Sequence, residues 1–446
     1  MKLCDIQLSE YGKLSSTPSP INRMMAEFAA NFRPDIDINL GVGYVNENTI
    51  PREYICDAMR DIIDKPEKYP LALNYGGSKG SSNLINSIRR FYTDNTVGML
   101  SEETLSGKEI IIGPNGATSL LESIASVIEP GIVITTDPMY YIYCNFLERR
   151  GFDILAVPED NEGIRTDVLE RKIRGLGDKI GTLRYAYIVT VSNPTGTILS
   201  NSRRAELVGI VSDVANRLGR PVPVIFDKAY EDLIHDETVP KPESGFLYDT
   251  NNLVYEIGTL SKLLAPALRI GYMIGSDAPF MRSMVQKTSD AGFSAPQITQ
   301  EIAGYLLDNH VSKQIEFINS GYRSKAAAIK ARIDEKLGGD IESCSGGQAG
   351  FYFYLTLNGI ETTENSPFFK FLTRTTGDPA VDGPENGTYP RVIYIPGEFC
   401  VHSAGDMVDA GKRQLRLSYG FEETDRILSA IDHIKEAVEY AKDIRQ

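Results

Sequence analysis

Short apolar runs alternate with segments of helical period from about residue 48 to residue 290. Between the runs lie stretches such as SLLESIASVI (119–128), in which the leucines and isoleucines share one helical face. Continuous apolar strands, unlike alternating ones, are buried on both faces, so the pattern predicts a mostly parallel sheet covered by helices. The runs are residues 109–113, 131–136, 152–157, 186–191, 222–227 and 252–258.

The pattern changes in the last third of the chain. Residues 297–336 have the period of two helices, and the strand-like segments GFYFYLTL and RVIYIPG precede a helical stretch at 422–443. Another helix is expected at 20–33. We therefore predict an α/β protein with a large domain of mostly parallel sheet and a smaller α+β domain. The expected parts are an N-terminal segment contributing to the small domain (1–47), the large domain (48–320) and the C-terminal small domain (321–446).

Composition narrows the possible partners and the compartment. The chain has 446 residues and a net charge of −14, which argues against nucleic acid or an anionic membrane as a partner. Its five cysteines are scattered without a CxxC spacing, which indicates a reducing compartment and no metal cluster. The first residues lack the apolar core of a signal peptide, and no apolar run is long enough to span a bilayer. We expect a cytoplasmic protein that binds no metal.

Unusual residues stand at or just after the ends of four predicted strands. In open parallel sheets, ligands bind at the carboxyl ends of the strands, so these positions matter most. Each motif alone has an ordinary explanation: a glycine turn, an Asn-Pro turn or a helix N-cap. The motifs are GPNGATS (113–119), SNPTG (192–196), DKAY (227–230) and TLSK (259–262).

Lys262 is the least ordinary of these residues. It lies in an apolar run seven residues before Arg269, and both burial and a like charge lower the pKa of a lysine. A neutral amine can attack a carbonyl to form a Schiff base. Arg269, with Thr259 and Ser261, could meanwhile hold a phosphate dianion. The set is self-consistent if the ligand carries both an aldehyde and a phosphate.

At this point the sequence resembles the class I/II aminotransferases, which are pyridoxal-phosphate (PLP) enzymes of fold type I. The resemblance runs from about Asn39 to Tyr419 and rests on nine motifs in family order. These are NLGVG (39–43), NYGGSKG (74–80), NGATSLLESI (115–124), DPMYYIY (137–143), SNPTG, FDKAYEDL (226–233), TLSKLLAPALRIGY (259–272), PGEFC (396–400) and LRLSYG (415–420).

The resemblance implies roles for the residues that would contact the cofactor ring. Lys262 would form the Schiff base and move a proton between the substrate α-carbon and the cofactor. Asp227 would pair with the pyridine nitrogen and keep it protonated. Asn193 and Tyr230 would hydrogen-bond the ring hydroxyl, and Tyr140 would stack on the ring. Lys262, Asp227, Tyr230 and Asn193 are the implied catalytic residues.

It also implies how the phosphate and the substrate are held. Arg416 would bind the substrate carboxylate as a bidentate fork, together with Asn193 and the backbone amide of Gly43. Tyr75 would reach the phosphate in the other subunit of a homodimer. The phosphate would be held by Gly116, Ala117, Thr118, Thr259, Ser261 and Arg269.

The activity implied is transamination between an L-amino acid and a 2-oxo acid, through the Lys262 Schiff base and a pyridoxamine-phosphate intermediate. A carbon–sulfur lyase, a cyclopropane-forming synthase and a decarboxylase would share the same constellation and remain alternatives. Residues 285–297 offer Lys287 but no arginine for a second substrate carboxylate. The aromatic residues Tyr44, Tyr140, Tyr141 and Phe293 suggest an apolar or aromatic side chain instead.

Two readings from other classes are weaker. A PLP-sensing regulator would carry an N-terminal DNA-binding module, whereas here the motifs begin by residue 39 and the charge is strongly negative. A plain nucleotide-binding α/β protein is the other option, and a colourless preparation that never binds PLP would favour it.

Overall fold

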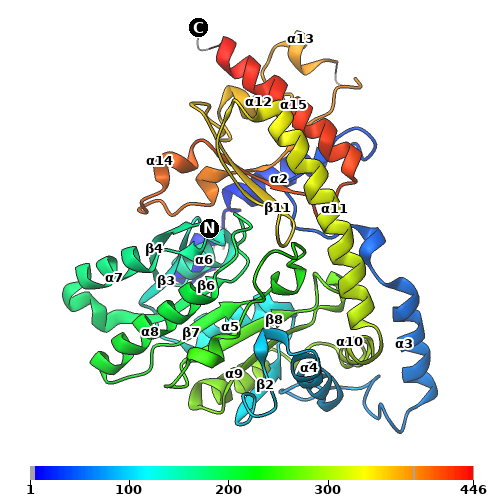
Figure 1. The fold of residues 1–446 in the computed structure, drawn as a ribbon, viewed down its shortest axis with the longest axis vertical. Coiled ribbons are helices and arrows are strands. Elements are labelled where there is room, and N and C mark those ends of the chain that lie inside the picture. The colour runs from blue at the N-terminus through cyan, green and yellow to red at the C-terminus, as the bar shows by residue number, and fades with distance from the viewer. Residues whose placement is uncertain (1–5, 385–386, 445–446) are drawn as a thin grey trace, which may run out of the picture.

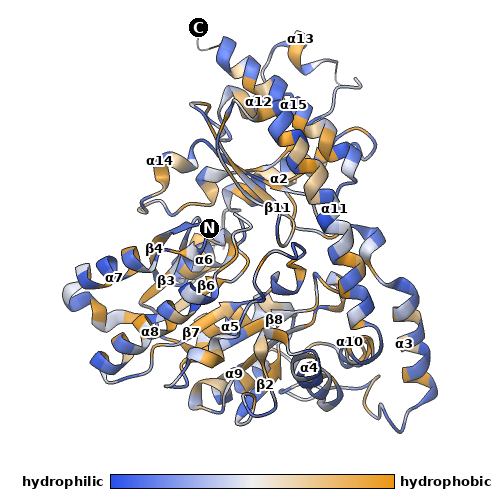
Figure 2. Ribbon diagram, in the orientation of Figure 1, coloured by the Kyte–Doolittle hydropathy of each residue, from blue (hydrophilic) through white to orange (hydrophobic). Residues whose placement is uncertain are grey.

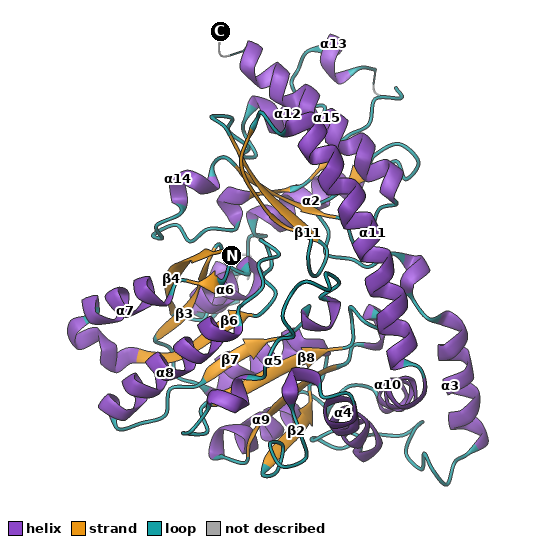
Figure 3. Ribbon diagram, in the orientation of Figure 1, coloured by secondary structure: helices purple, strands orange, loops and turns teal. Residues whose placement is uncertain are grey.

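The computed structural model describes residues 6–384 and 387–444. Its largest element is an eight-stranded sheet with the order β2-β9-β8-β7-β6-β3-β4-β5 (Figures 1 and 3). Strands β8, β7, β6, β3 and β4 pair in parallel, and β9 runs antiparallel between β2 and β8. The strands are β2 (Lys108–Ile112), β3 (Ile132–Asp137), β4 (Asp153–Asp160), β5 (Gly163–Ile164), β6 (Leu183–Val189), β7 (Val224–Asp227), β8 (Val254–Thr259) and β9 (Gly271–Ser276).

The helices cover this sheet on both faces, as the apolar runs predict. Ile111 packs with α5, α6 and α9 on one face, whereas its neighbours Ile110 and Ile112 pack with α4, α8 and α10 on the other. Figure 2 shows the apolar strands enclosed by helices whose outer surfaces are polar. The covering helices are α4 (Ser82–Asp94), α5 (Gly116–Val127), α6 (Tyr141–Arg149), α7 (Thr166–Gly175), α8 (Asn201–Leu218), α9 (Pro279–Asp290) and α10 (Gln297–Asn309), and α3 (Arg52–Asp64) packs on α10.

A second, four-stranded antiparallel sheet has the order β10-β11-β14-β13. The long helix α11 connects it with the large sheet, and α15 packs against both α11 and α12 (Figure 1). These elements are β10 (Ile341–Gly346), β11 (Tyr352–Leu357), β13 (Ile395–Pro396), β14 (Gln414–Ser418), α11 (Val311–Leu337), α12 (Pro367–Thr373), α13 (Pro379–Asp382), α14 (Val408–Gly411) and α15 (Thr424–Asp443). The fold prediction, a mostly parallel α/β unit plus a smaller α+β unit, is confirmed.

The N-terminal segment contacts both units. Helix α1 (Glu10–Leu14) packs on α6, where the Tyr11 ring lies 5.9 Å from the Phe146 ring. Helix α2 (Pro20–Ala30) begins at the expected residue, and Arg23 pairs with Glu364 of the smaller unit at 2.8 Å. Strand β1 (Ile38–Asn39) then pairs in parallel with β12 (Val392–Ile393). β1 and β12 form a two-stranded sheet of their own, and the segment therefore crosses from the large unit to the smaller one.

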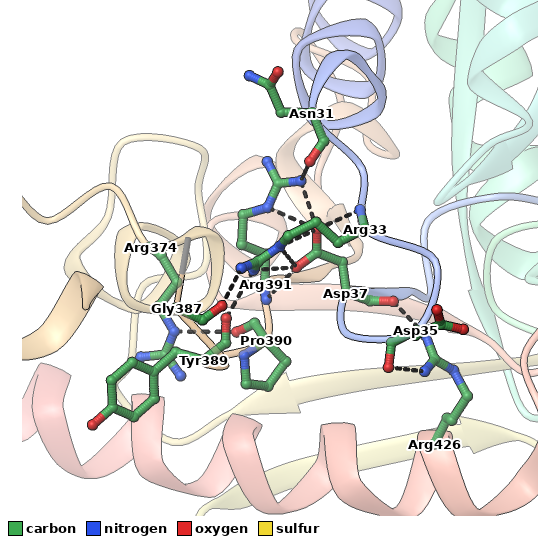
Figure 4. A network of polar contacts seen from close by, with 10 residues as sticks. All are labelled: Asn31, Arg33, Asp35, Asp37, Arg374, Gly387, Tyr389, Pro390, Arg391 and Arg426. Atoms are coloured by element: carbon green, nitrogen blue, oxygen red, sulfur yellow. Dashed lines mark hydrogen bonds and ion pairs between the residues drawn. The ribbon is translucent and has the colours of Figure 1, made fainter. Parts of the chain in front are cut away.

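A buried carboxylate fixes the end of this segment (Figure 4). Asp37 is fully buried and forms ion pairs of 2.6 Å with both Arg33 and Arg391. Burial raises the pKa of Asp37, but hydrogen bonds from the two arginines outweigh that effect and leave its pKa well below the usual range. Arg33 also donates to the carbonyls of Gly387 and Tyr389. These contacts hold the chain after α2 against the strand β12.

Candidate active site

A cavity of about 690 Å³ opens at the carboxyl ends of the large sheet's strands, where the small sheet and α2 close over them. Twelve of the fourteen residues predicted for the site line it. The ordered motifs therefore converge in space, although they are spread over most of the sequence. The twelve are Gly43, Ala117, Thr118, Tyr140, Asn193, Asp227, Tyr230, Thr259, Ser261, Lys262, Arg269 and Arg416.

The start of α5 forms an anion-binding corner of this cavity. Gly116 has φ +70°, and a Cβ there would lie 2.8 Å from Arg269 Nη2, so glycine permits the close approach of the guanidinium. Arg269 Nε donates to Asn115 Oδ1 at 2.7 Å, and the Asn115 side chain makes no capping bond to α5. The amide of Gly116 donates to Arg269 O at 2.8 Å, so the amides that follow it in α5 are the ones left for an anionic ligand. Gly116 belongs to this corner although it does not line the cavity itself.

Lys262 follows β8 and points its amine into the cavity. Its Nζ donates to Gly43 O at 2.6 Å and lies 5.8 Å from the centre of the Tyr230 ring. Burial, followed by the positive charges of Arg416 and Arg269, lowers the pKa of the Lys262 amine to about 8. Among the described residues no carboxylate forms an ion pair with this ammonium, and such an environment favours a neutral, nucleophilic amine.

Asp227 ends β7 and is 5% exposed. Its Oδ2 accepts a hydrogen bond from the Tyr187 hydroxyl at 2.8 Å, and its Oδ1 accepts one from the amide of Ala229 at 3.1 Å. Burial raises the pKa of Asp227 to about 6, against the opposing effect of these two bonds. Tyr187 was not predicted, because an aromatic residue inside a continuous apolar strand has the pattern of core packing.

Buried charges hold the turn that follows Asp227. Lys228 Nζ lies 3.0 Å from Glu256 Oε2 and 3.2 Å from Glu231 Oε1. Arg204 Nη2 lies 3.0 Å from Glu231 Oε2, and all four side chains are at most 4% exposed. Two positive and two negative charges therefore balance one another directly behind the site.

Arg416 lies on β14 and is 2% exposed. Its Nη1 donates to Asn193 Oδ1 at 2.8 Å, and its Nη2 donates to Gly41 O at 2.5 Å. One outer nitrogen thus faces the Asn193 side chain, and the other faces the backbone that precedes Gly43. This is the geometry of a fork that can hold a carboxylate with two parallel hydrogen bonds.

The two adjacent tyrosines at the start of α6 have different surroundings. Burial, and after it the charge of Asp227, raises the pKa of Tyr140, so its phenol lies near that carboxylate. The Tyr141 ring centre is 5.9 Å from the Arg416 guanidinium instead. The surroundings therefore agree with Tyr140, rather than Tyr141, as the residue beside the ring of a ligand bound at Asp227.

Tyr352 on β11 is a cavity residue that the sequence analysis missed. Its hydroxyl lies 2.8 Å from the Tyr230 hydroxyl, and its ring centre lies 4.6 Å from the Arg416 guanidinium. GFYFYLTL contains four aromatic residues, and period-2 alternation does not single out the one that meets Tyr230.

Helix α2 forms another unpredicted wall. It buries Ile21, Met24 and Phe28 in the core. The side of the helix that lines the cavity carries apolar and neutral residues: Ile21, Asn22, Met25, Ala26 and Ala29. The helix was predicted from its period, but its position over the site depends on the contacts of Asp37, which lie far apart in sequence.

Tyr75 does not line this cavity. It is 81% exposed, and its ring lies 6.1 Å from the ring of Phe293, beside a separate pocket. Phe293 and Lys287 are likewise absent from the cavity lining, whereas Tyr44 and Tyr141 belong to it. The role of Tyr75 in a partner subunit stays a prediction.

The residues fit pyridoxal phosphate. The uncapped start of α5, together with Arg269, suits a dianionic phosphate. The Asp227 carboxylate has the negative charge that a protonated ring nitrogen requires. Lys262, with its lowered pKa, provides the amine that an aldehyde requires. The described residues contain no group of three or more His, Cys, Asp and Glu side chains that could hold a metal ion, and no helix among them is long and apolar enough to cross a membrane.

Comparison with known proteins agrees with this geometry. The family model described as aminotransferase class I and II matches residues 36–374. The aromatic-amino-acid aminotransferase 1 of Thermococcus litoralis is 25% identical over 90% of this chain and 88% of its own length. An uncharacterised helix-turn-helix-type transcriptional regulator of Bacillus subtilis is also 25% identical, but the match covers 76% of this chain and 64% of the regulator.

Among solved structures, the kynurenine aminotransferase of Pyrococcus horikoshii superimposes with a TM-score of 0.79 at 24% identity, covering 96% of both chains. A multiple-substrate aminotransferase from Thermococcus profundus reaches a TM-score of 0.81 at 20% identity over 98% of both chains. These structures show the same fold, that of the fold type I PLP enzymes. The family match spans most of the chain, and the chain belongs to the class I and II aminotransferase family, which is PLP-dependent.

Proposed function

We propose that this protein transfers the amino group of an L-amino acid with a large uncharged side chain to a 2-oxo acid, with PLP as its cofactor. One observation carries the substrate class. Three cations line the cavity: Lys262, Arg269 and Arg416. Lys262 binds the cofactor aldehyde, Arg269 binds the cofactor phosphate and Arg416 binds the substrate α-carboxylate. None of the residues in that lining offers a further cation for an acidic side chain.

The binding roles follow from position. Arg269 and the first amides of α5 hold the phosphate, and Asp227 holds the proton on the ring nitrogen. Tyr230 and Asn193, which also line the cavity, would hydrogen-bond the ring hydroxyl. Bound in this way, PLP supplies an electron-withdrawing ring that stabilises negative charge at the substrate α-carbon.

The chain's own residues direct the proton transfer. Arg416 fixes the substrate carboxylate and so orients the α-carbon within the cavity. The Lys262 amine, once released, accepts the α-proton, because lowering its pKa to about 8 makes the neutral form more accessible near neutral pH than it is for an ordinary lysine. Helix α2 covers the cavity and limits the access of water.

The walls support a large, uncharged side chain. Helix α2 presents Met25, Ala26 and Ala29 to the cavity, and Tyr44 and Ile142 line it as well. Apolar walls bind apolar side chains, and an acidic group against them would lack a partner. The relatives compared above are named for aromatic amino acids, for kynurenine and for multiple substrates, which fits this class.

We also propose a homodimer in which Tyr75 completes the partner's phosphate site. The support is the exposed apolar group around it: Leu71, Leu73 and Tyr75 are 50%, 77% and 81% exposed. A patch of this kind indicates a protein interface. The division at residues 47 and 320, with the N-terminal segment joined to the small domain, and a cytoplasmic location remain proposals. The four described cysteines are free thiols, which supports a reducing compartment.

The test is a donor panel with the PLP-loaded protein, using pyruvate and 2-oxoglutarate as acceptors. Phenylalanine, tyrosine and leucine should exceed aspartate in kcat/KM by about tenfold or more, since an unpaired carboxylate in an apolar pocket is strongly rejected. Aspartate as the best donor would contradict the substrate class. Release of ammonia without an amino acid product would instead favour the lyase alternative, which the aminotransferase relatives do not support.

A further inference from the structure

Tyr352 connects two parts of the cavity that come from different sheets. It lies on β11 of the small sheet and is 1% exposed. Its hydroxyl is 2.8 Å from the hydroxyl of Tyr230, which follows β7 of the large sheet. Both phenols are buried, and burial raises the pKa of each, so both remain protonated. The contact is therefore a hydrogen bond between two neutral hydroxyls.

The same ring supports the arginine fork. The Tyr352 ring centre lies 4.6 Å from the Arg416 guanidinium, within the range of a cation–π contact. Arg416 on β14 lies directly opposite Tyr354 on β11. Tyr352 is on β11 too, two residues before Tyr354. A shift of the Tyr352 ring would therefore change the direction in which the fork points.

A third contact of Tyr352 is with the backbone of Gly43, beside Lys262. A Cβ on Gly43 would lie 2.7 Å from the Tyr352 hydroxyl oxygen, so that hydroxyl rests against the backbone of Gly43. The carbonyl of Gly43 accepts the hydrogen bond of Lys262 Nζ at 2.6 Å. Tyr352 thus touches Tyr230, Arg416 and the glycine that holds the amine.

We propose that Tyr352 is a positioning residue that aligns Tyr230 with the cofactor ring hydroxyl and Arg416 with the substrate carboxylate; this rests on the proposed function. Tyr230 has a single hydroxyl proton. If Tyr352 donates to the Tyr230 oxygen, that proton is directed to the cofactor's ring oxygen, and the donated bond is strengthened by the chain. The small sheet therefore contributes, through Tyr352, to the orientation of the hydroxyl that binds the cofactor.

Tyr352→Phe tests this by removing one oxygen and keeping the ring. The first readout is the pH midpoint of the visible absorption of the PLP-loaded protein without substrate. A weaker bond from Tyr230 leaves more negative charge on the ring oxygen, which holds the neighbouring proton on the Lys262 nitrogen more tightly. The midpoint should rise by about 0.5 pH units, the shift expected for one hydrogen bond.

Tyr354→Phe is the matched control. Tyr354 is a buried tyrosine on the same strand, but its hydroxyl donates to Gln414 Oε1 at 3.1 Å, outside the cavity lining. It should leave the midpoint unchanged. The second readout is a double-mutant cycle: Tyr230→Phe and Tyr230→Phe/Tyr352→Phe should have the same midpoint, because the Tyr352 hydroxyl acts through Tyr230.

The outcomes separate the inference from the proposed function. If the wild-type protein binds no PLP or shows no transamination, the proposed function fails and takes the inference with it. If the wild type transaminates but Tyr352→Phe leaves the midpoint where it was, or the two shifts add, the inference alone is overturned. A raised midpoint that Tyr354→Phe does not reproduce supports it.

Discussion

Arg416→Lys isolates the carboxylate fork, since it keeps the charge and removes the two-pronged geometry. In the structure both outer nitrogens of Arg416 already make hydrogen bonds, 2.8 Å to Asn193 Oδ1 and 2.5 Å to Gly41 O. These two bonds fix the orientation of the guanidinium within the cavity. A lysine ammonium at this position presents one point charge instead of a planar pair of donors.

The magnitude follows from the loss of one charge-assisted hydrogen bond. Such a bond contributes about 1.5–3 kcal/mol, so kcat/KM for the amino donor should fall by a factor of roughly 10–150. The assay is single-turnover conversion of the PLP-loaded protein by phenylalanine, followed in the visible spectrum at several concentrations. The loss should be present for every amino acid, because all of them carry the α-carboxylate.

Arg413→Lys is the control for this variant. Arg413 precedes β14 and donates to Leu357 O at 3.0 Å near the surface, away from the cavity lining. It should stay within about twofold of the wild type, as surface substitutions usually do. If Arg416→Lys retains the wild-type kcat/KM while its fold is intact by circular dichroism, the carboxylate is bound elsewhere and the assignment is wrong.

Four further predictions test other parts of the site. In the PLP-free protein, Lys262 should be acetylated with a midpoint near pH 8, because it is neutral only above its lowered pKa; peptide mass spectrometry after labelling at several pH values measures this. Tyr187→Phe removes a bond that lowers the pKa of Asp227, so that pKa should rise and the acidic limb of the kcat/KM profile should move to higher pH. Met25→Arg places a cation on the cavity side of α2 and should raise the aspartate-to-phenylalanine ratio of kcat/KM by about tenfold or more. Lys228→Ala leaves the buried Glu256 carboxylate without a cation and Glu231 with Arg204 alone, and it should cost about 3–5 kcal/mol in denaturant unfolding.

The sequence was sufficient for the parts of the site that follow from strand ends. Continuous apolar strands predict a parallel sheet, and parallel strands bring their carboxyl ends to one edge. Asn193, Asp227 and Lys262 therefore meet although they lie far apart in the chain. Arg416 is different, because it lies in the small sheet and its place in the cavity was implied by the family motif alone.

The remaining parts depend on long-range packing that local pattern does not encode. Tyr187 and Tyr352 lie in apolar strands, where a hydroxyl that serves the site cannot be told from a core aromatic. Helix α2 has a clear period, but its place over the cavity is set by Asp37, which meets Arg33 four residues away and Arg391 across 354 residues. Tyr75 faces solvent in a single chain, so its role requires a second copy.

The most direct test of the account is the visible spectrum of the PLP-loaded protein before and after one equivalent of L-phenylalanine, with ammonia and 2-oxo acid measured together. The account predicts a yellow protein that bleaches in proportion to the amino acid and releases phenylpyruvate without ammonia. Lys262→Ala should bind PLP but bleach more slowly by a factor of about 10³ or more, since it lacks the proton-transferring amine. A Lys262→Ala protein that turned over at the wild-type rate, or a wild type that bound no PLP, would contradict the central claim.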